Sequence, residues 1–329
     1  MTGTSPAAAA VELAVLERGG FVESRHVGSA IVLGPDGEVV RALGDPAAPI
    51  LPRSSMKPFQ AVAAMTSGVT LRGEDAAIAT ASHTGTARHV ALVRGLLARE
   101  SLPASALRCP PEHPTDRAAR DELVRCGAKA EAITMNCSGK HAAMLLACRA
   151  NGWSIEDYLD PDHALQKRVL DVLQRLTGER PVATVVDGCG APVHALGLTG
   201  LARGIQKIAS SSPSSPFALF REAAALADAV RSNGWAVAGP GRPDSVAIDR
   251  LGVFAKFGAE GVQVMAARDG TTVALKMLDG SGRAATVVGL RLLEREGALA
   301  ASDVADAMTK RSLSVSGGGR VVGAIRPAL

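Results

Sequence analysis

Apolar and polar residues alternate along the N-terminal part of the chain with the period of two that is typical of strands. Together with many β-branched residues, this alternation predicts strands at Val11–Arg18 and Val22–Leu33. The turn-forming stretch Gly34-Pro35-Asp36-Gly37 follows, and a further strand is predicted over Glu38–Leu43. The fold therefore opens with antiparallel hairpins.

The central part of the chain has apolar residues at helical spacing. A helix is predicted around the apolar run Ala61–Met65, and Glu74–Thr80 fits either a short helix or a strand. Four further helices are predicted at Ala87–Arg99, Asp116–Cys126, Ala142–Ala150 and Pro161–Leu176. These segments predict a helical subdomain at roughly residues 74–180.

The C-terminal part returns to strands. The predicted strands are Val182–Val186, Leu251–Lys256, Val262–Ala267 and Thr272–Met277, and the predicted helices are Phe217–Val230, Arg283–Glu296 and Ser302–Lys310. A tail with three consecutive glycines from Gly317 follows. We predict an α+β fold in one domain over residues 1–329, with an antiparallel sheet built from both chain ends and flanked by helices.

Composition narrows the class of protein. The 329 residues are 47% hydrophobic and 3% aromatic, with a net charge of +4. Because the basic residues are scattered, a nucleic-acid partner is not expected. No stretch of about 18 apolar residues predicts a membrane span, and the N-terminus lacks the pattern of a signal peptide. The five cysteines form no regular framework. We predict a cytoplasmic protein with reduced thiols.

The first candidate chemistry is a Ser-x-x-Lys spacing just before the central apolar run. On a helix, Ser54 and Lys57 would share one face. A serine nucleophile needs an adjacent base, and a lysine serves only if its pKa falls about 3 units from roughly 10.4. Arg53 would supply one cationic neighbour. The alternative interpretation is an ordinary helix start, capped by Ser54 or Ser55.

A second hydroxyl and a second lysine are candidates for the same site. Ser82 lies in a predicted loop, and Lys256 ends a predicted strand beside Gly258. This lysine could polarise Ser82 or stabilise a developing oxyanion. Lys276 is a rival for that role. Turn chemistry for Ser82 and an exposed strand end for the lysine are the alternatives.

Cys137, Lys140 and Cys189 form a third candidate group. Cys137 precedes a predicted helix N-terminus, which lowers a thiol pKa, and Cys189 lies in a Gly-Cys-Gly turn. Two thiolates and a nitrogen ligand would suit Zn²⁺ with an open position. Two buried structural cysteines, or a nucleophilic cysteine, are the alternatives.

Asp187 and Arg242 are candidates for binding a small charged substrate. A carboxylate at Asp187 could hold an ammonium group, and Arg242 could clamp a carboxylate through two hydrogen bonds. An Asx turn at Asp187-Gly188 and a surface arginine are the alternatives.

Seven stretches together resemble the asparaginase II family, the class 3 or Rhizobium-etli-type L-asparaginases. They are Val22–Gly28, Arg53–Gln60, Ala81–His83, Asn136–His141, Asp187–Pro192, Gly239–Arg242 and Ala255–Gly261. The chain departs from the expected pattern at Pro243 and Phe257, which bears on substrate specificity.

The resemblance implies a fold similar to serine β-lactamases and penicillin-binding proteins, and a homodimer. It also implies roles for single residues. Ser54 with Lys57 and Ser82 with Lys256 would form two Ser-Lys pairs. Cys137, Lys140 and Cys189 would hold zinc, while Arg53, His141, Asp187 and Arg242 would bind the substrate.

The predicted function is therefore hydrolysis of L-asparagine to L-aspartate and ammonia. Lys57 would take the Ser54 proton, Ser54 would attack the side-chain amide, and Ser82 with Lys256 would pass a proton to the ammonia. Two alternatives remain. One is a serine hydrolase of β-lactams or D-Ala peptides, and the other is a non-catalytic sensor that binds an amino acid.

Overall fold

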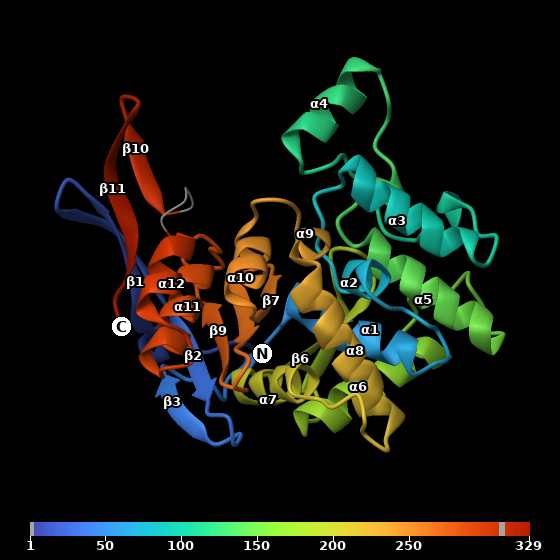
Figure 1. Cartoon of the computed structure of the whole chain (residues 1–329), viewed down its shortest axis with the longest axis horizontal. Coiled ribbons are helices and arrows are strands. Elements are labelled where there is room, and N and C mark those ends of the chain that lie inside the picture. The colour runs from blue at the N-terminus through green and yellow to red at the C-terminus, as the bar shows by residue number, and fades with distance from the viewer. Residues whose placement is uncertain (1–2, 309–312) are drawn as a thin grey trace.

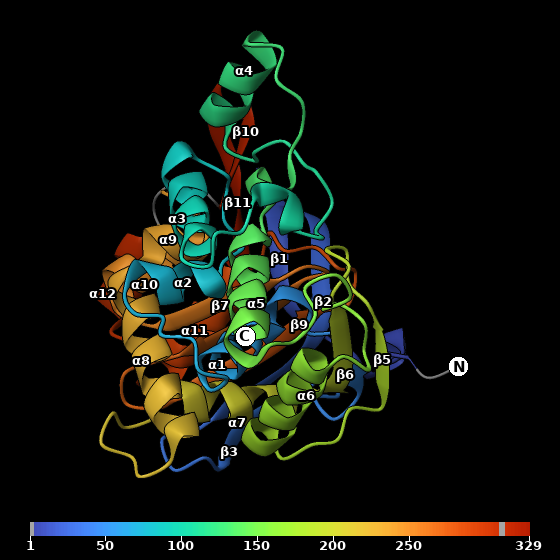
Figure 2. The same cartoon turned by 90° about the vertical axis from the view of Figure 1, so that its right-hand side faces the viewer.

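The structure is a computed structural model, and it describes residues 3–308 and 313–329. Figures 1 and 2 show a large sheet at one side of the molecule and a group of helices at the other. The helix α4 (Arg117–Arg125) projects from the helical side. No helix in the described ranges combines the length and the apolar character that crossing a membrane needs.

The large sheet takes its strands from both ends of the chain. In the described residues its order is β10-β11-β1-β2-β9-β8-β7, with β3 paired to β2, and every pairing is antiparallel. The strands are β1 (Val11–Arg18), β2 (Phe21–Leu33), β3 (Val39–Leu43), β7 (Phe254–Gly258), β8 (Val262–Ala266), β9 (Thr272–Met277), β10 (Ser314–Gly317) and β11 (Arg320–Pro327). The predicted α+β class with this sheet is confirmed.

The pairing of β2 with β9 joins the two halves of the sequence. Ile31 lies opposite Ala274, and both side chains are buried. The C-terminal tail, for which no strand was predicted, forms β10 and β11, and β11 pairs with β1. Gly318 and Gly319 turn this hairpin with φ of 56° and 74°, a conformation that favours glycine. The strand pairing of the tail depends on β1, some three hundred residues away.

A small sheet lies beside the helices. Its order is β4 (Pro49–Ile50), β6 (Pro192–Gly197) and β5 (Ala183–Val186). The predicted strand from Val182 is thus observed as β5, whereas β6 was missed.

The helices follow most of the predicted segments. They are α1 (Lys57–Met65), α2 (Glu74–Ala79), α3 (Ala87–Ala98), α4, α5 (Ser138–Asn151), α6 (Ala164–Thr177), α7 (Leu198–Ala209), α8 (Ala218–Ser232), α9 (Gly234–Val237), α10 (Pro243–Leu251), α11 (Ala285–Arg295) and α12 (Ala301–Met308). The ambiguous segment at Glu74 is helical. The helix predicted to end at Lys310 is α12, and its last two predicted residues lie outside the described ranges.

One boundary differs from the prediction for a local reason. The strand expected from Leu251 starts instead at Phe254, because α10 runs to Leu251. Gly252 ends this helix with φ of 65°, and its N–H donates to the carbonyl of Ile248. A left-handed glycine of this kind is a common end of a helix.

The helix α1 lies at the centre of the molecule. All nine of its residues are buried, including Lys57 at 1% exposure, and α1 packs against α5, α6 and α8. A helix that is apolar nearly all round is stable only in the interior. Its single cation is consequently held inside the protein, where a charge is costly unless it has partners.

Candidate active site

Ser54 lies in a short 3-10 turn, η2 (Arg53–Met56), that leads directly into α1. Arg53 has φ of 50°, one of the few positive values outside glycine among the described residues. Such a backbone conformation costs about 1–3 kcal/mol and is found most often at functional sites. The turn presents Ser54 half-buried at the surface of two cavities.

The strand β7 is held against this turn. Ser55 Oγ donates to the carbonyl of Lys256 at 3.2 Å. A side chain at Gly258 would place its Cβ 2.4 Å from the carbonyl oxygen of Pro52, so only glycine allows this approach. The contact fixes Lys256, which is 1% exposed, close to the start of α1.

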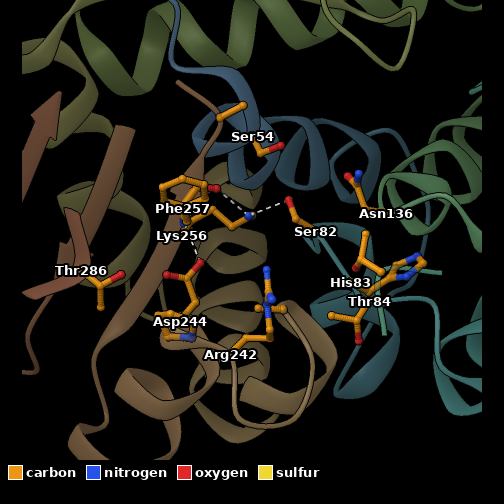
Figure 3. Close-up of a pocket in the computed structure, with 14 residues that line it drawn as sticks. Ser54, Ser82, His83, Thr84, Asn136, Arg242, Asp244, Lys256, Phe257 and Thr286 are labelled. Carbon is orange, nitrogen blue, oxygen red and sulfur yellow. Dashed lines mark hydrogen bonds between the residues drawn. The ribbon is translucent and has the colours of Figure 1, made fainter. Parts of the chain in front are cut away.

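Ser82 lies between two buried lysines (Figure 3). Lys57 Nζ and Lys256 Nζ each lie 2.9 Å from Ser82 Oγ. Lys57 Nζ also donates to the carbonyl of Ala81 at 2.5 Å, and Lys256 Nζ to that of Phe257 at 2.9 Å. The structure thus brings Ser82 and Lys256 together as the resemblance implied.

The expected contact between Lys57 and Ser54 is not formed. Within the described residues no hydrogen bond joins them, since Lys57 points to Ser82 instead. Ser54 and Ser82 both point into the pocket that Figure 3 shows. The two hydroxyls and the two lysines therefore form one cluster rather than two separate pairs.

The charge of Lys57 affects the protonation of Lys256. Burial, and then the positive charge of Lys57, lower the pKa of Lys256 to about 7, against a smaller opposing effect of Asp244. A neutral amine at 2.9 Å from a hydroxyl is a general base for it. Lys256 thus has the properties that the sequence analysis required of a catalytic lysine.

The loop that carries Ser82 is rigidly held. The N–H of Ser82 donates to the carbonyl of Val237 at 2.8 Å. The N–H of His83 donates to the carbonyl of Asn136 at 3.2 Å. The buried His83 ring has Nε2 2.9 Å from Ser138 Oγ. His83 accordingly positions the loop.

Two cavities meet at Ser54. The first, about 250 Å³, is lined by Ser82, Lys256 and Arg242, and we call it the lysine chamber. The second, about 360 Å³, is lined by Arg53, Asp187, Cys137 and Cys189, and we call it the cysteine chamber. Both chambers share Ser54, Asn136 and Ala259 in their walls. A molecule bound at Ser54 can thus extend to either side of it.

The cysteine chamber contains an ion pair. Arg53 Nε lies 2.5 Å from Asp187 Oδ1, and their side chains are 24% and 12% exposed. The same carboxylate oxygen accepts the N–H of Gly188 at 2.8 Å. Two residues expected to bind the substrate therefore lie side by side and offer one cationic and one anionic group.

Cys137, Lys140 and Cys189 also come together, behind this chamber. Lys140 Nζ donates to Cys189 Sγ at 2.9 Å, and the Cys137 thiol lies 3.0 Å from Asn136 Oδ1. Hydrogen bonding from Cys137 and the charge of Lys140 hold the pKa of Cys189 well below its usual range, despite burial. Burial disfavours the charge of Lys140, but the negative sulfur outweighs it and raises the lysine pKa.

This donor set has the chemistry of an open zinc site. Two sulfurs and one amine would be the three protein ligands, and the cysteine chamber would supply the free side. Cys137 and Lys140 must both lose a proton to bind the metal. Among the described residues no group of three or more His, Cys, Asp or Glu side chains is arranged for a metal. The lysine is therefore an essential member of any such site.

Of three other predicted residues, two lie away from both chambers and one lines a chamber. His141 is fully buried, with Nδ1 2.7 Å from the Tyr158 hydroxyl, and it lines neither chamber. Lys276 donates to the carbonyls of Glu260 and Met277 instead of Ser82. Arg242, at the start of α10, points into the lysine chamber.

Asp244 and Asn136 line the site but were not singled out from the sequence. Asp244 is 3% exposed and accepts the N–H of Phe257 at 2.6 Å and Gln263 Nε2 at 3.1 Å. It thereby holds the strand that carries Lys256. The signal was present, because a proline followed by an acidic residue is typical of a helix start.

The whole chain matches one protein family. The family model described as L-asparaginase II matches residues 14–327. The chain therefore belongs to the L-asparaginase II family. A search of curated proteins found no match.

Two solved structures with a similar fold are those of Mglu and of a Bacillus glutaminase. A structure of Mglu in its tris and glutamate form has 14% identity and a TM-score of 0.48, and the match covers 88% of this chain and 63% of that one. A Bacillus glutaminase in 4.3 M NaCl has 12% identity and a TM-score of 0.46, with 82% of this chain and 91% of that one covered. This chain spans 64% of the length of Mglu in its native form.

Proposed function

We propose that this protein hydrolyses L-asparagine to L-aspartate and ammonia, with Ser54 as the nucleophile. The observation that carries the proposal is the cluster at Ser54: a free hydroxyl beside a second one, Ser82, which two buried lysines contact at 2.9 Å. A serine needs a base within hydrogen-bond reach to react with an amide.

The contacts suggest the path of the protons. Neutral Lys256 accepts the proton of Ser82, and Ser82 in turn takes the proton of Ser54 as Ser54 Oγ attacks the amide carbon. The same groups then return a proton to the leaving nitrogen when the C–N bond breaks. The positive charge of Lys57 stabilises the negative charge that develops on Ser82 Oγ during these proton transfers. Water hydrolyses the acyl-enzyme by the reverse path.

The cysteine chamber suits the α-amino-acid end of the substrate. Asp187 would hold the ammonium group and Arg53 the carboxylate, because these two charged groups lie together beside Ser54. The side-chain amide then reaches Ser54, with its nitrogen toward Ser82 and Lys256. Arg242 stays a candidate for a carboxylate on the other side.

Zinc is part of the proposal, with Cys137, Lys140 and Cys189 as its ligands. When bound, it would anchor the substrate at the cysteine chamber. We also propose that the protein is a homodimer in the cytoplasm. Its partner would be a small-molecule substrate, and neither nucleic acid nor a membrane would be a partner.

We expect the purified protein to retain about one zinc ion per chain after gel filtration. The variant C189S should retain less than about a tenth of that, because a hydroxyl is a far weaker zinc ligand than a thiolate. Cys148, a buried cysteine whose pKa Cys189 and Lys140 do not affect, provides the control C148S. Metal content by mass spectrometry measures this, and equal zinc in all three proteins would disprove the site.

The proposed reaction is tested by measuring ammonia release from L-asparagine and from L-glutamine, with nitrocefin turnover in parallel. We expect release from asparagine, at a kcat/KM at least about tenfold above that for glutamine, because one methylene misplaces the amide by more than a bond length. Nitrocefin turnover without ammonia would favour a β-lactam hydrolase. Tight binding of asparagine without ammonia would favour a sensor.

A further inference from the structure

The lysine chamber is much larger than the proposed reaction requires. The side of Ser54 that faces Ser82 and Lys256 has to receive only the departing ammonia, a molecule about as large as water, which occupies about 30 Å³ in the liquid. The chamber measures about 250 Å³. Most of it would be unused during hydrolysis of a primary amide.

The walls of the chamber carry polar groups without partners. Arg242 is exposed at its edge and points inward, and no carboxylate pairs with it in the part of the chain that the structure describes. Thr84 Oγ1 lines the same chamber, is 6% exposed as a residue, and has no hydrogen-bond partner. A buried hydroxyl without a partner is costly unless a ligand supplies one.

The nearby carboxylate, Asp244, is not available to neutralise Arg242. Its two oxygens accept the N–H of Phe257 and the side-chain amide of Gln263. The guanidinium is thus a free, fork-shaped cation opposite the catalytic cluster, which is the group that recognises a carboxylate best.

We propose that the enzyme also hydrolyses amides whose nitrogen carries a substituent ending in a carboxylate, of which β-aspartyl peptides are the simplest class. This inference rests on the proposed function. The aspartyl part occupies the cysteine chamber, and the leaving amino acid extends through the lysine chamber to Arg242. Ser54 Oγ bonds to the β-carbonyl carbon, the C–N bond breaks, and the amino acid leaves with the proton that Ser82 returns.

The orientation follows from the proton transfer. The leaving nitrogen must face Ser82 and Lys256 to be protonated, so any substituent on it enters the lysine chamber. The α-ammonium and α-carboxylate of the aspartyl part already find Asp187 and Arg53 on the opposite side. Arg242 is therefore left for the carboxylate of the leaving group.

The test compares three substrates: L-asparagine, β-aspartyl-glycine, and β-aspartyl-glycinamide, in which the terminal carboxylate is replaced by a neutral amide. Release of ammonia, glycine or glycinamide is followed by amino-acid analysis. We expect the wild type to cleave β-aspartyl-glycine with a kcat/KM about tenfold or more above that for the glycinamide, because the charge-assisted contact to Arg242 is lost in the latter.

Arg242→Gln should abolish this preference for the free carboxylate. Arg250→Gln is the matched control, since Arg250 lies on the same helix and pairs with Asp306 at the surface. Arg250→Gln should keep the preference.

Cleavage of L-asparagine without cleavage of either peptide would overturn this inference and leave the proposed function standing. Loss of all three reactions in the wild type would overturn both. An equal loss for asparagine and the peptide in Arg242→Gln would place the α-carboxylate at Arg242 and overturn the orientation.

Discussion

Replacing Ser54 by alanine is expected to lower kcat for L-asparagine by at least about a thousandfold, because the acyl-enzyme can no longer form. Folding should be nearly unaffected. Ser54 is half-buried, and its Oγ has no hydrogen-bond partner in the described residues. We therefore expect a Tm within about 2 °C of the wild type, as for surface substitutions in general. Ammonia release under single-turnover conditions and calorimetry measure the two quantities.

Ser67→Ala is a suitable control for this experiment. Ser67 follows the other end of α1, and its hydroxyl donates to the carbonyl of Ala63. Its substitution should leave kcat within about a factor of two. If Ser54→Ala retained activity, the nucleophile would have to be sought among Ser82 and the thiols of Cys137 and Cys189, and the proposed mechanism would be refuted.

The sequence predicted the sheet well because its strands carry their own patterns. The alternation in Val11–Leu33 and the short β-branched runs near Val262 and Thr272 report burial of one or both faces directly. The strands β10 and β11 carry a weaker signal, since they are only partly buried and each contains a glycine. They exist because β1 offers an edge to pair with, which is a property of the tertiary fold.

The membership of the site was more predictable than its contacts. Ser54, Lys57, Ser82 and Lys256 were found from motifs, and the structure places them in one cluster. Helical spacing indicated that Ser54 and Lys57 share a face. A lysine side chain is long and flexible, however, so it can reach several other hydrogen-bond acceptors. Ser82 and the carbonyl of Ala81 come from a distant loop, and no local pattern reports their position.

His141 shows the limit of transferring a role with a motif. It follows Lys140 in the resembling stretch, yet the turn of α5 directs its ring to Tyr158. Lys140 donates to Cys189 Sγ, and the buried His141 ring also acts on Cys189, whose pKa it lowers through a hydrogen bond. The residue thus acts on the cysteine group from behind and does not line the chamber.

Lys256→Met should lower kcat/KM for L-asparagine by about 10²–10⁴-fold, the usual contribution of a general base. In the wild type the neutral form of Lys256 is the active one. Since its pKa is about 7, kcat/KM should rise about tenfold per pH unit below pH 7 and level off above it. In the variant this rise should disappear. Lys276→Met, which removes a lysine that donates to the carbonyls of Glu260 and Met277, should keep both the activity and the pH profile.

Although Lys256→Met should lower the activity, we expect it to raise the stability of the folded protein near and below pH 7. The pKa of Lys256 is about 7 in the folded protein and close to 10.5 in the unfolded chain. Between these values the unfolded state binds the extra proton, so the free energy of unfolding rises with pH from about 7 to 10.5, by an amount of order 5 kcal/mol. Methionine carries no charge and removes this cost. We expect the increase in Tm from pH 6.5 to pH 9.5 to be smaller in Lys256→Met than in the wild type, and its Tm at pH 6.5 to equal or exceed that of the wild type. A variant that lost activity and stability together, with an unchanged pH dependence of Tm, would show that Lys256 is a structural residue and that the base lies elsewhere.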